Sequence, residues 1–203
     1  MSGSESVNTV PNDADGGAGL LETRLSTPAR LLGAPAPDRP VLLRMLGAAV
    51  RVPDHGRRVP FRFVTIEGTA RDALGEALAE ITRARHPDPD PATLEKDRAR
   101  FSHAPLVVAV VAVLDPEDEK IPEQERLLSA GCACFSLLLA AQAEGFGAQW
   151  LTGWPAYDAQ VLARLGLSAH ERIAGFIHIG TPTRQAPERA RPDPQVLLSD
   201  WQP

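Results

Sequence analysis

Arginines dominate the part of the chain whose residue types and spacing could bind an anion. Between Arg24 and Arg62 there are eight Arg, two Asp and no Lys or Glu, a net charge of +6, although the whole 203-residue chain carries -5. The guanidinium group presents its donors in a planar fork that suits phosphate oxygens. This basic island therefore indicates a local anionic ligand, and the alternative is a set of solvated helix-face arginines. The overall charge argues against a nucleic-acid binder that neutralises many phosphates.

Two further donors stand at a predicted helix end inside the island. Arg51 and His55 are four residues apart, beside a sharp Pro53-Asp54 turn, so we expect both side chains to point into one space. The alternative for His55 is a solvated surface histidine. The other histidines lie in loop, polar or strand contexts that favour structural roles: His86, His103, His170 and His178.

Other common catalytic motifs are missing from the sequence. It has no Gly-rich phosphate loop of Rossmann or Walker type, no Gly-x-Ser-x-Gly elbow and no histidine pair with zincin spacing. Cys132 and Cys134 are two residues apart on a predicted helix, which disfavours a disulfide or a shared metal. We expect two small buried hydrophobic residues there, and no metal site.

The elements that must position these residues follow one another in a mixed α+β order. The patterns predict helices over residues 20–25, 39–51, 69–85, 92–101, 123–144 and 158–165, and strands over 61–66, 106–114, 148–151 and 172–179. Asp38 and Thr69 are the expected N-caps of the second and third helices. The strand over 106–114 is apolar throughout, which indicates burial on both faces.

The longest predicted helix, residues 123–144, is apolar almost all round in its second half, which predicts a fully buried central helix. The longest apolar run, residues 105–114, is too short to cross a bilayer, and no signal peptide is visible. We therefore expect a cytoplasmic protein with no membrane partner. Residues 1–19 are expected to be a disordered tail and 20–203 one domain. The segment after Gly180 lacks a core of its own, so it must lie along other surface or on a partner.

Five short motifs occur in a fixed order between Leu20 and Pro182. They are Thr23-Arg24-Leu25-Ser26-Thr27-Pro28, the run from Arg51-Val52-Pro53-Asp54-His55 to Phe63, Ser129-Ala130-Gly131-Cys132-Ala133, Gly145-Phe146-Gly147-Ala148-Gln149-Trp150, and Gly175-Phe176-Ile177-His178-Ile179-Gly180-Thr181-Pro182. This ordered set resembles the nitroreductase family, and most closely its compact NAD(P)H nitroreductase branch.

The resemblance implies a three-layer α+β fold with a mainly antiparallel sheet flanked by helices, and a homodimer with FMN at its interface. It places Arg24, Leu25 and Ser26 on the flavin phosphate or ribityl chain. It brings Arg51 and His55 to the same flavin, from the partner subunit in this family. A second flavin wall is implied at Trp150, Leu151 and Thr152. A nicotinamide-nucleotide contact is implied at Ala140, Ala141, Gln142, Ala143, Glu144 and Gly145.

Three positions depart from the family pattern. Leu25 stands where the opening motif has a second Arg, Phe61 stands where the family has Trp, and Leu151 stands where the compact branch can carry Arg. Larger family members hold the phosphate with a late Arg-x-Arg, and this chain has Arg189-Ala190-Arg191. We hypothesise that Arg189 or Arg191 replaces the missing charge, and the alternative is that both lie on a solvated tail.

The expected function is that of an FMN-dependent oxidoreductase. It would move two electrons as a hydride from NADPH or NADH to a nitroaromatic, quinone or similar small acceptor by a ping-pong mechanism. A different FMN reaction, such as dehydrogenation, dehalogenation or flavin breakdown, is one alternative. The others are a flavin-binding or interaction protein without turnover, which Leu25 and Leu151 would favour, and a plain α+β scaffold.

Overall fold

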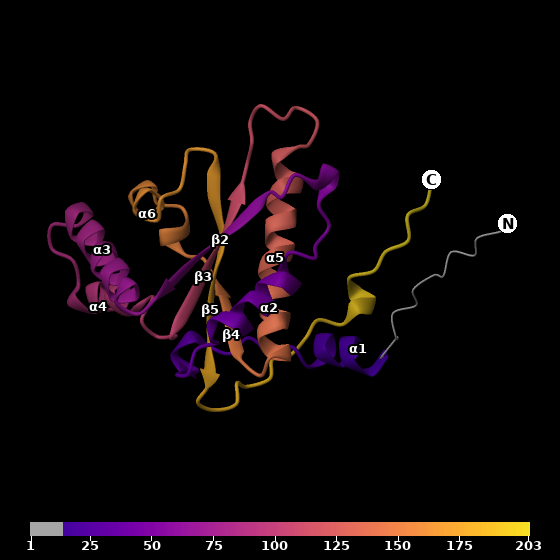
Figure 1. Ribbon diagram of the computed structural model, residues 1–203, viewed down its shortest axis with the longest axis horizontal. Helices are drawn as coiled ribbons and strands as arrows, with labels where there is room; N and C mark the ends of the chain where they lie inside the picture. The colour runs from indigo at the N-terminus through magenta and orange to yellow at the C-terminus, as the bar shows by residue number, and fades with distance from the viewer. Residues whose placement is uncertain (1–13) are drawn as a thin grey trace.

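The computed structural model describes residues 14–203 and shows a sheet between two layers of helices (Figure 1). The strands are β1 Leu32–Gly33, β2 Phe61–Glu67, β3 Leu106–Val113, β4 Gly147–Leu151 and β5 Glu171–Pro182. The helices are α1 Ala14–Thr23, α2 Arg39–Ala49, α3 Thr69–Arg85, α4 Pro91–Ala99, α5 Glu123–Ala143 and α6 Ala159–Arg164. Helices α2 and α5 cover one face of the sheet, and α3, α4 and α6 lie toward the other.

The sheet is antiparallel at every pairing. Its order is β1-β5-β3-β2, and β4 also pairs with β5. Strand β3 is buried along its length except at Val113, as its unbroken apolar sequence predicts. Its alternate side chains enter two separate cores, with Val108 and Val110 facing α5 and Val107 and Val111 facing α3. The predicted α+β fold with a mainly antiparallel sheet is confirmed.

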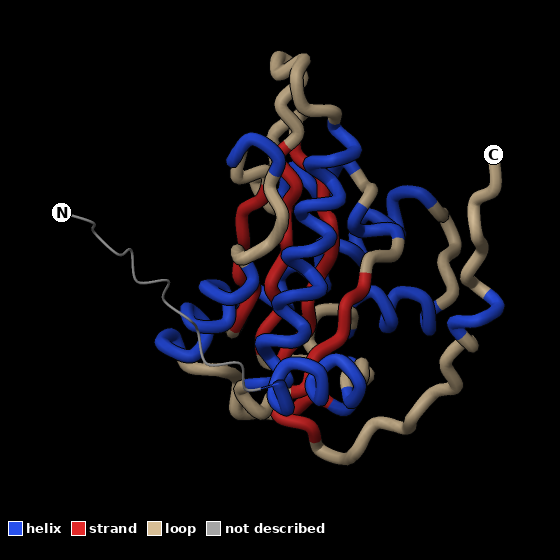
Figure 2. Tube along the Cα trace, turned by 90° about the vertical axis from the view of Figure 1, so that its right-hand side faces the viewer, coloured by secondary structure: helices blue, strands red, loops and turns tan. Residues whose placement is uncertain are grey.

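Helix α5 runs along the sheet in the α2 layer (Figure 2). One face is buried, whereas Leu128 and Phe135 are 61% and 38% exposed and Cys132 is also exposed. The prediction of a fully buried helix was therefore wrong for this chain by itself. The predicted burial of Cys132 was also wrong. Cys134 is buried, and burial raises the pKa of its thiol to about 12. The all-round apolar pattern arises because one face packs inward while another apolar face stays uncovered.

Helix α5 is also long and apolar enough, by length and composition alone, to span a membrane. Half of its apolar window is buried, and its inner face lies in the core beside α2 and the sheet. A core helix passes the same test of length and composition. The cytoplasmic location stays a prediction.

Helix starts follow local capping chemistry. The Asp38 carboxylate accepts a hydrogen bond of 2.9 Å from the Val41 N–H, which confirms the predicted cap of α2. At α3 the prediction was wrong by one residue: Gly68 is the N-cap and makes no side-chain bond, and Thr69 is the first helical residue. Gly68 has φ +56°, a conformation that favours glycine at this turn.

The two ends of the chain depart from the expected boundaries. Helix α1 begins at Ala14, six residues before the predicted helix, so that residues 14–19 of the expected tail are helical. Residues 1–13 lie outside the described part of the chain. At the other end, β5 continues to Pro182 and pairs with the unpredicted β1. The domain boundary stays a prediction.

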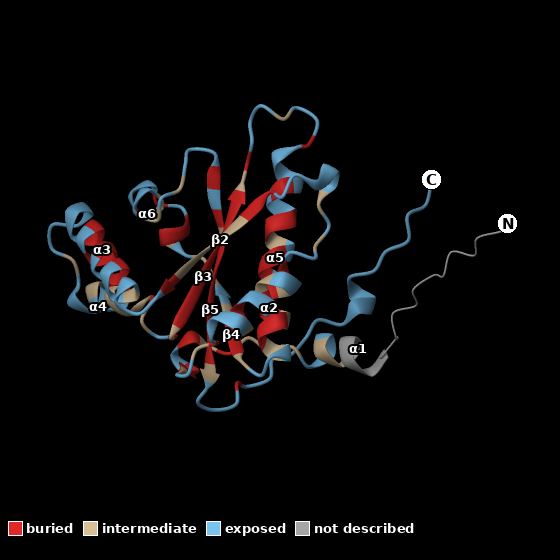
Figure 3. Ribbon diagram, in the orientation of Figure 1, coloured by how far each residue is buried: buried red, intermediate tan, exposed pale blue. Residues whose placement is uncertain are grey.

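The C-terminal segment leaves the body of the molecule after the buried Ala186 (Figures 1 and 3). Every residue from 187 to 203 is exposed, including four large apolar side chains that are 70–86% exposed: Val196, Leu197, Leu198 and Trp201. The exposure of this segment agrees with the sequence expectation that it lacks a core of its own.

His178 is a buried titratable group in the centre of β5. Its side chain is 1% exposed, its ring stacks on Phe101 at a centroid distance of 6.1 Å, and Nδ1 has no hydrogen-bond partner within residues 14–203. Burial lowers the pKa of His178 to about 4, with smaller contributions from the charges of His103 and Arg100. The imidazole is therefore neutral in the folded protein at neutral pH.

The stability of the protein should fall as the pH drops from about 6.5 to about 4, because the unfolded chain protonates His178 in that window and the folded chain does not. The full effect is on the order of 3 kcal/mol. His178→Leu should flatten this pH dependence, whatever its effect on stability at neutral pH. Urea unfolding across the window measures both proteins. An equally steep fall in the variant would show that other groups cause it.

Candidate flavin-binding site

The opening motif lies beside the C-terminal end of α5. The backbone N–H of Leu25 donates to Oε1 of Gln142 at 3.3 Å, and the Arg24 guanidinium donates to Oγ of Ser26 at 3.3 Å. All three motif residues are partly buried. Arg24 thus has most of its guanidinium donors left for a ligand, beside the Ser26 hydroxyl.

Arg51 and His55 lie beyond α2 and at the other end of α5. Helix α2 ends at Ala49, and His55 begins a separate 3-10 helix, His55–Arg57, so the expected four-residue spacing across one helix end was wrong. The His55 Nδ1 lies 2.7 Å from Oε2 of Glu125, in the first turn of α5. Arg51 is exposed, and its guanidinium makes no hydrogen bond or ion pair within the described residues.

The length of α5 separates the two cationic motifs. Gln142, which contacts the opening motif, follows Glu125, which contacts His55, by 17 helical residues. At 1.5 Å per residue, this corresponds to about 25 Å along the helix axis. One chain therefore cannot bring both motifs to the same phosphate or to the same small ring.

The segment predicted to form the second flavin wall, residues 150–152, lies at the end of β4 on the inner side of α5. The Trp150 indole Nε1 donates to the Ala174 carbonyl of β5 at 3.1 Å, and the ring lies over Gly175, where a Cβ would overlap it. Leu151 pairs with Phe176, and Thr152 follows the strand end. Glycine at position 175 is thus required by the close approach of the indole.

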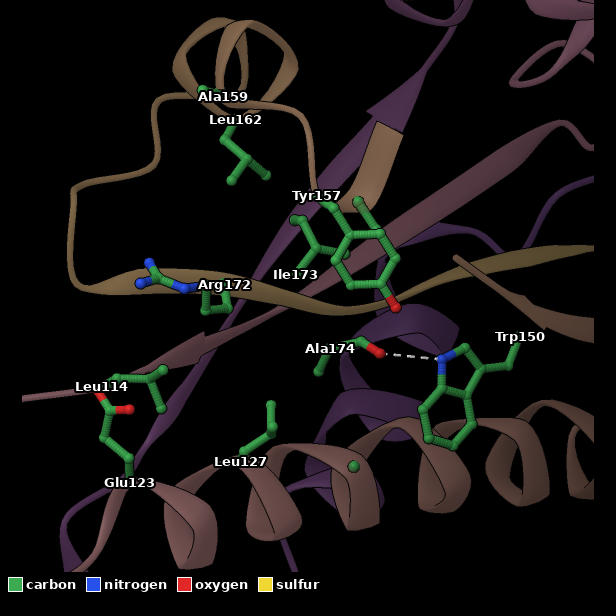
Figure 4. A pocket seen from close by; sticks show the side chains of 12 residues that line it. Leu114, Glu123, Leu127, Trp150, Tyr157, Ala159, Leu162, Arg172, Ile173 and Ala174 are labelled. Carbon is green, nitrogen blue, oxygen red and sulfur yellow. Dashed lines mark hydrogen bonds between the residues drawn. The ribbon is translucent and has the colours of Figure 1, made fainter. Parts of the chain in front are cut away.

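A cavity of about 650 Å³ opens beside Trp150 (Figure 4). Its walls come from α5, β4, β5, the end of β3 and the segment around α6. They are mostly apolar: Leu114, Leu127, Trp150, Tyr157, Leu162 and Ile173. Polar groups at its edge are the Tyr157 hydroxyl, Glu123 and Arg172. This volume and lining fit a flat organic molecule.

An ion pair fixes the start of β5 at the edge of this cavity. The Arg62 guanidinium donates to both carboxylate oxygens of Glu171, one of them at 2.9 Å. This hydrogen-bonded pair lowers the pKa of Glu171 to about 2. The carboxylate therefore stays ionised at neutral pH, and Arg172 beside it is held at the cavity edge.

The segment expected to contact a nicotinamide nucleotide forms the end of α5. Ala140 and Ala141 are buried, and both polar atoms of the Gln142 amide bond to the opening segment. The Glu144 carboxylate accepts two hydrogen bonds from Arg44, at 3.0 and 2.7 Å, which lower its pKa. Ala143 and Gly145 are exposed. The nucleotide contact stays a prediction.

Of the two late arginines, Arg191 approaches the opening motif. Its Nη2 donates to the Arg24 carbonyl at 3.3 Å and to Glu188 at 2.8 Å. The Arg189 side chain is exposed and makes no hydrogen bond within residues 14–203. The hypothesis that one of them replaces a missing phosphate contact stays open, and Arg191 has the better position. In the same residues, no group of three or more His, Cys, Asp or Glu could hold a metal ion.

The comparison with known families agrees with this geometry. Residues 22–181 match the model of the family described as "Nitroreductase family". The chain belongs to the nitroreductase family. The resemblance drawn from the five motifs is thereby confirmed.

Two curated relatives extend over nearly the whole chain. A protein of Haemophilus influenzae named "Putative NAD(P)H nitroreductase" is 36% identical over 172 residues, which cover 85% of this chain and 91% of the relative. The protein of Escherichia coli K12 named "Putative NAD(P)H nitroreductase YdjA" is 35% identical over 181 residues, covering 89% and 96%.

Solved structures share the nitroreductase fold. The nitroreductase-like protein of Bacillus cereus superposes with a TM-score of 0.74 at 24% identity and covers 90% of this chain and 94% of its own. A Desulfovibrio desulfuricans protein described as "a putative nitroreductase in complex with fmn" gives a TM-score of 0.69 at 23% identity, covering 92% and 97%. At these identities the likeness establishes the fold.

Several residues of the candidate site were not found from the sequence. The cavity residues Leu127, Tyr157 and Leu162 come from three elements, and no spacing along the chain links them. Gln142 was expected to contact a nucleotide, and its hydrogen bonds to the opening segment were not foreseen. The sequence did point to Gly175, which lies within one of the five motifs. Its contact with Trp150 could not be predicted, because that contact depends on the pairing of β4 with β5.

Gly175→Ala should destabilise the protein by roughly 1–3 kcal/mol, because the added methyl must displace the Trp150 indole from the cavity wall. Gly131→Ala on the opposite side of the same indole is the matched control, since a Cβ there would meet the ring at 3.9 Å, an ordinary contact. Urea unfolding followed by circular dichroism compares the two variants. Equal stability of Gly175→Ala and the parent protein would contradict the proposed contact.

Proposed function

We propose that this protein is an FMN-dependent oxidoreductase that transfers a hydride from NADPH or NADH to a nitroaromatic, quinone or similar flat acceptor. Membership of the nitroreductase family carries the proposal. The names of the curated relatives and the FMN bound in the Desulfovibrio desulfuricans structure support it. The donor set and the apolar cavity of this chain are consistent with such a cofactor.

The residues present fit the two ends of FMN. Arg24 and Ser26 offer a guanidinium and a hydroxyl to the phosphate or ribityl chain, and Arg191 adds a second guanidinium nearby. Trp150, Leu151 and Thr152 would line one side of the ring system. The apolar side chains around the cavity would exclude water from the ring and leave a flat surface for the acceptor.

FMN, when bound, supplies the hydride acceptance and release, so the protein needs no nucleophile of its own. The role of the chain is to bind, orient and stabilise charge. A guanidinium fixed beside the ring edge where negative charge develops would favour reduction. Within residues 14–203 the Arg51 guanidinium makes no hydrogen bond or ion pair, so its donors are available for this task. Glu125 holds His55, four residues further along the chain.

We propose that the site is completed by a second copy of the chain. The two cationic motifs lie about 25 Å apart along α5, and the resemblance implies that Arg51 and His55 serve the flavin of a partner subunit. An isologous dimer with antiparallel α5 helices brings the N-terminal end of one helix to the C-terminal end of the other.

The exposed apolar residues of α5 match this arrangement. Leu128, Cys132, Phe135 and the partly buried Leu139 follow one another at four- and three-residue spacing, so they form one stripe on the helix. Leu128 lies three residues after Glu125, and Leu139 lies three residues before Gln142. If Glu125 faces the partner's Gln142, Leu128 then faces the partner's Leu139. The exposed apolar side chains of the C-terminal segment would find cover on the same partner.

The purified protein should be yellow, and its flavin absorbance should bleach when NADPH or NADH is added without oxygen. Reoxidation by nitro compounds, quinones or halogenated phenols then identifies the acceptor class. Bound flavin that neither nucleotide reduces would favour a binding protein without turnover. A colourless protein that does not retain added FMN would exclude the proposed function.

Phe135→Glu should convert the dimer to a monomer and weaken FMN binding at least tenfold, because it places a charge in the centre of the apolar stripe. Ala84→Glu, an exposed substitution on α3 at the other face of the sheet, is the control. Sedimentation and FMN titration measure the two effects. A Phe135→Glu protein that remains dimeric would place the interface elsewhere.

A further inference from the structure

The opening segment is attached to the body of the protein by two glutamine side chains. The Gln142 amide of α5 accepts from the Leu25 N–H and donates to Oγ1 of Thr23, both at 3.3 Å. From β4, Oε1 of Gln149 accepts from the Ala29 N–H at 2.6 Å. The two amides therefore form a glutamine clamp, which holds the backbone on either side of Ser26.

The segment needs such side-chain partners because it has no regular structure of its own. Residues 24–28 belong to no helix or strand, and the Thr27 N–H, which donates to the Ala148 carbonyl at 3.0 Å, is their one backbone link to the sheet. Without the amides, the partly buried N–H groups of Leu25 and Ala29 would lose their partners.

Close packing leaves little room for the segment to move past β4. A Cβ at Gly147 would lie 2.9 Å from Thr27 Oγ1 and 2.8 Å from Leu32 Cδ2, so a side chain there would push the segment away. The segment thus lies directly against the start of β4, the strand that carries Trp150. One short path of contacts connects the phosphate end of the candidate site to its ring end.

We propose that Gln142 and Gln149 are positioning residues, which hold Arg24 and Ser26 in their phosphate-binding arrangement before FMN arrives. This inference rests on the proposed function. A preorganised segment loses less conformational entropy on binding. It would offset part of the affinity lost where Leu25 replaces a second arginine. It also assigns the Gln142 side chain to the segment rather than to a nicotinamide nucleotide.

The test compares Gln142→Leu, Gln149→Leu and the double variant with Gln160→Leu, which replaces an exposed glutamine on α6. Each single substitution at the clamp should weaken FMN binding about threefold to tenfold, and the double variant by roughly the product. Gln160→Leu should bind FMN as the parent does. Thermal unfolding without FMN measures what each lost hydrogen bond contributes to the fold. A variant that unfolds at a lower temperature but binds FMN as the parent does would have a purely structural role.

Trypsin cleavage at the Arg24–Leu25 bond gives a readout that needs no flavin. The two clamp variants should be cut faster than the parent and the control in the absence of FMN, as measured by mass spectrometry. If the parent binds FMN and the clamp variants bind it equally well, this inference fails while the proposed function stands. If the parent binds no FMN, the proposed function fails, and faster cleavage would then show a clamp that serves another purpose than flavin binding.

Discussion

The packing of α5 against the sheet is the constraint on which the rest of the structure depends. Its buried face fills the core beside Val108, Val110 and Ile177, and this contact fixes both the rotation and the position of the helix. The opening motif is attached at one end and His55 at the other. The geometry of the candidate site follows from the length of this one helix.

The same packing explains why the chain has two kinds of apolar surface. Ala130, Ala133 and Ala141 are small enough for α5 to approach the sheet closely, and they are completely buried. Leu128 and Phe135 face away and remain exposed. A helix that is apolar on both faces needs cover on both, and a second copy of the chain would supply it. The candidate site and the proposed dimer thus both follow from a helix that carries apolar side chains on two faces.

The motifs were recognisable along the chain because each depends on local chemistry. Asp38 with its following helix and the unbroken apolar run of β3 report short-range requirements, whereas Gly147 and Gly175 reflect close contacts with distant residues. The mixed α+β order could be predicted on that basis, whereas the family and the antiparallel sheet were predicted from the resemblance of the five ordered motifs. The spacing of Arg51 and His55 misled the prediction because the helix ends at Ala49, so that Arg51 lies after it and His55 begins a separate 3-10 helix.

By itself, the sequence determined the elements and the types of residue that can bind an anion, since these follow from composition and short-range spacing. Its five ordered motifs carried the resemblance to the family. Only the tertiary structure decided which of those residues share a site. It separated Arg24 from His55 by the length of α5, brought Gln142 and Gln149 to the opening segment, and built the cavity beside Trp150 from distant elements. The reason is physical: contacts between residues more than a hundred positions apart depend on how the helix and the sheet pack, and no local pattern encodes them.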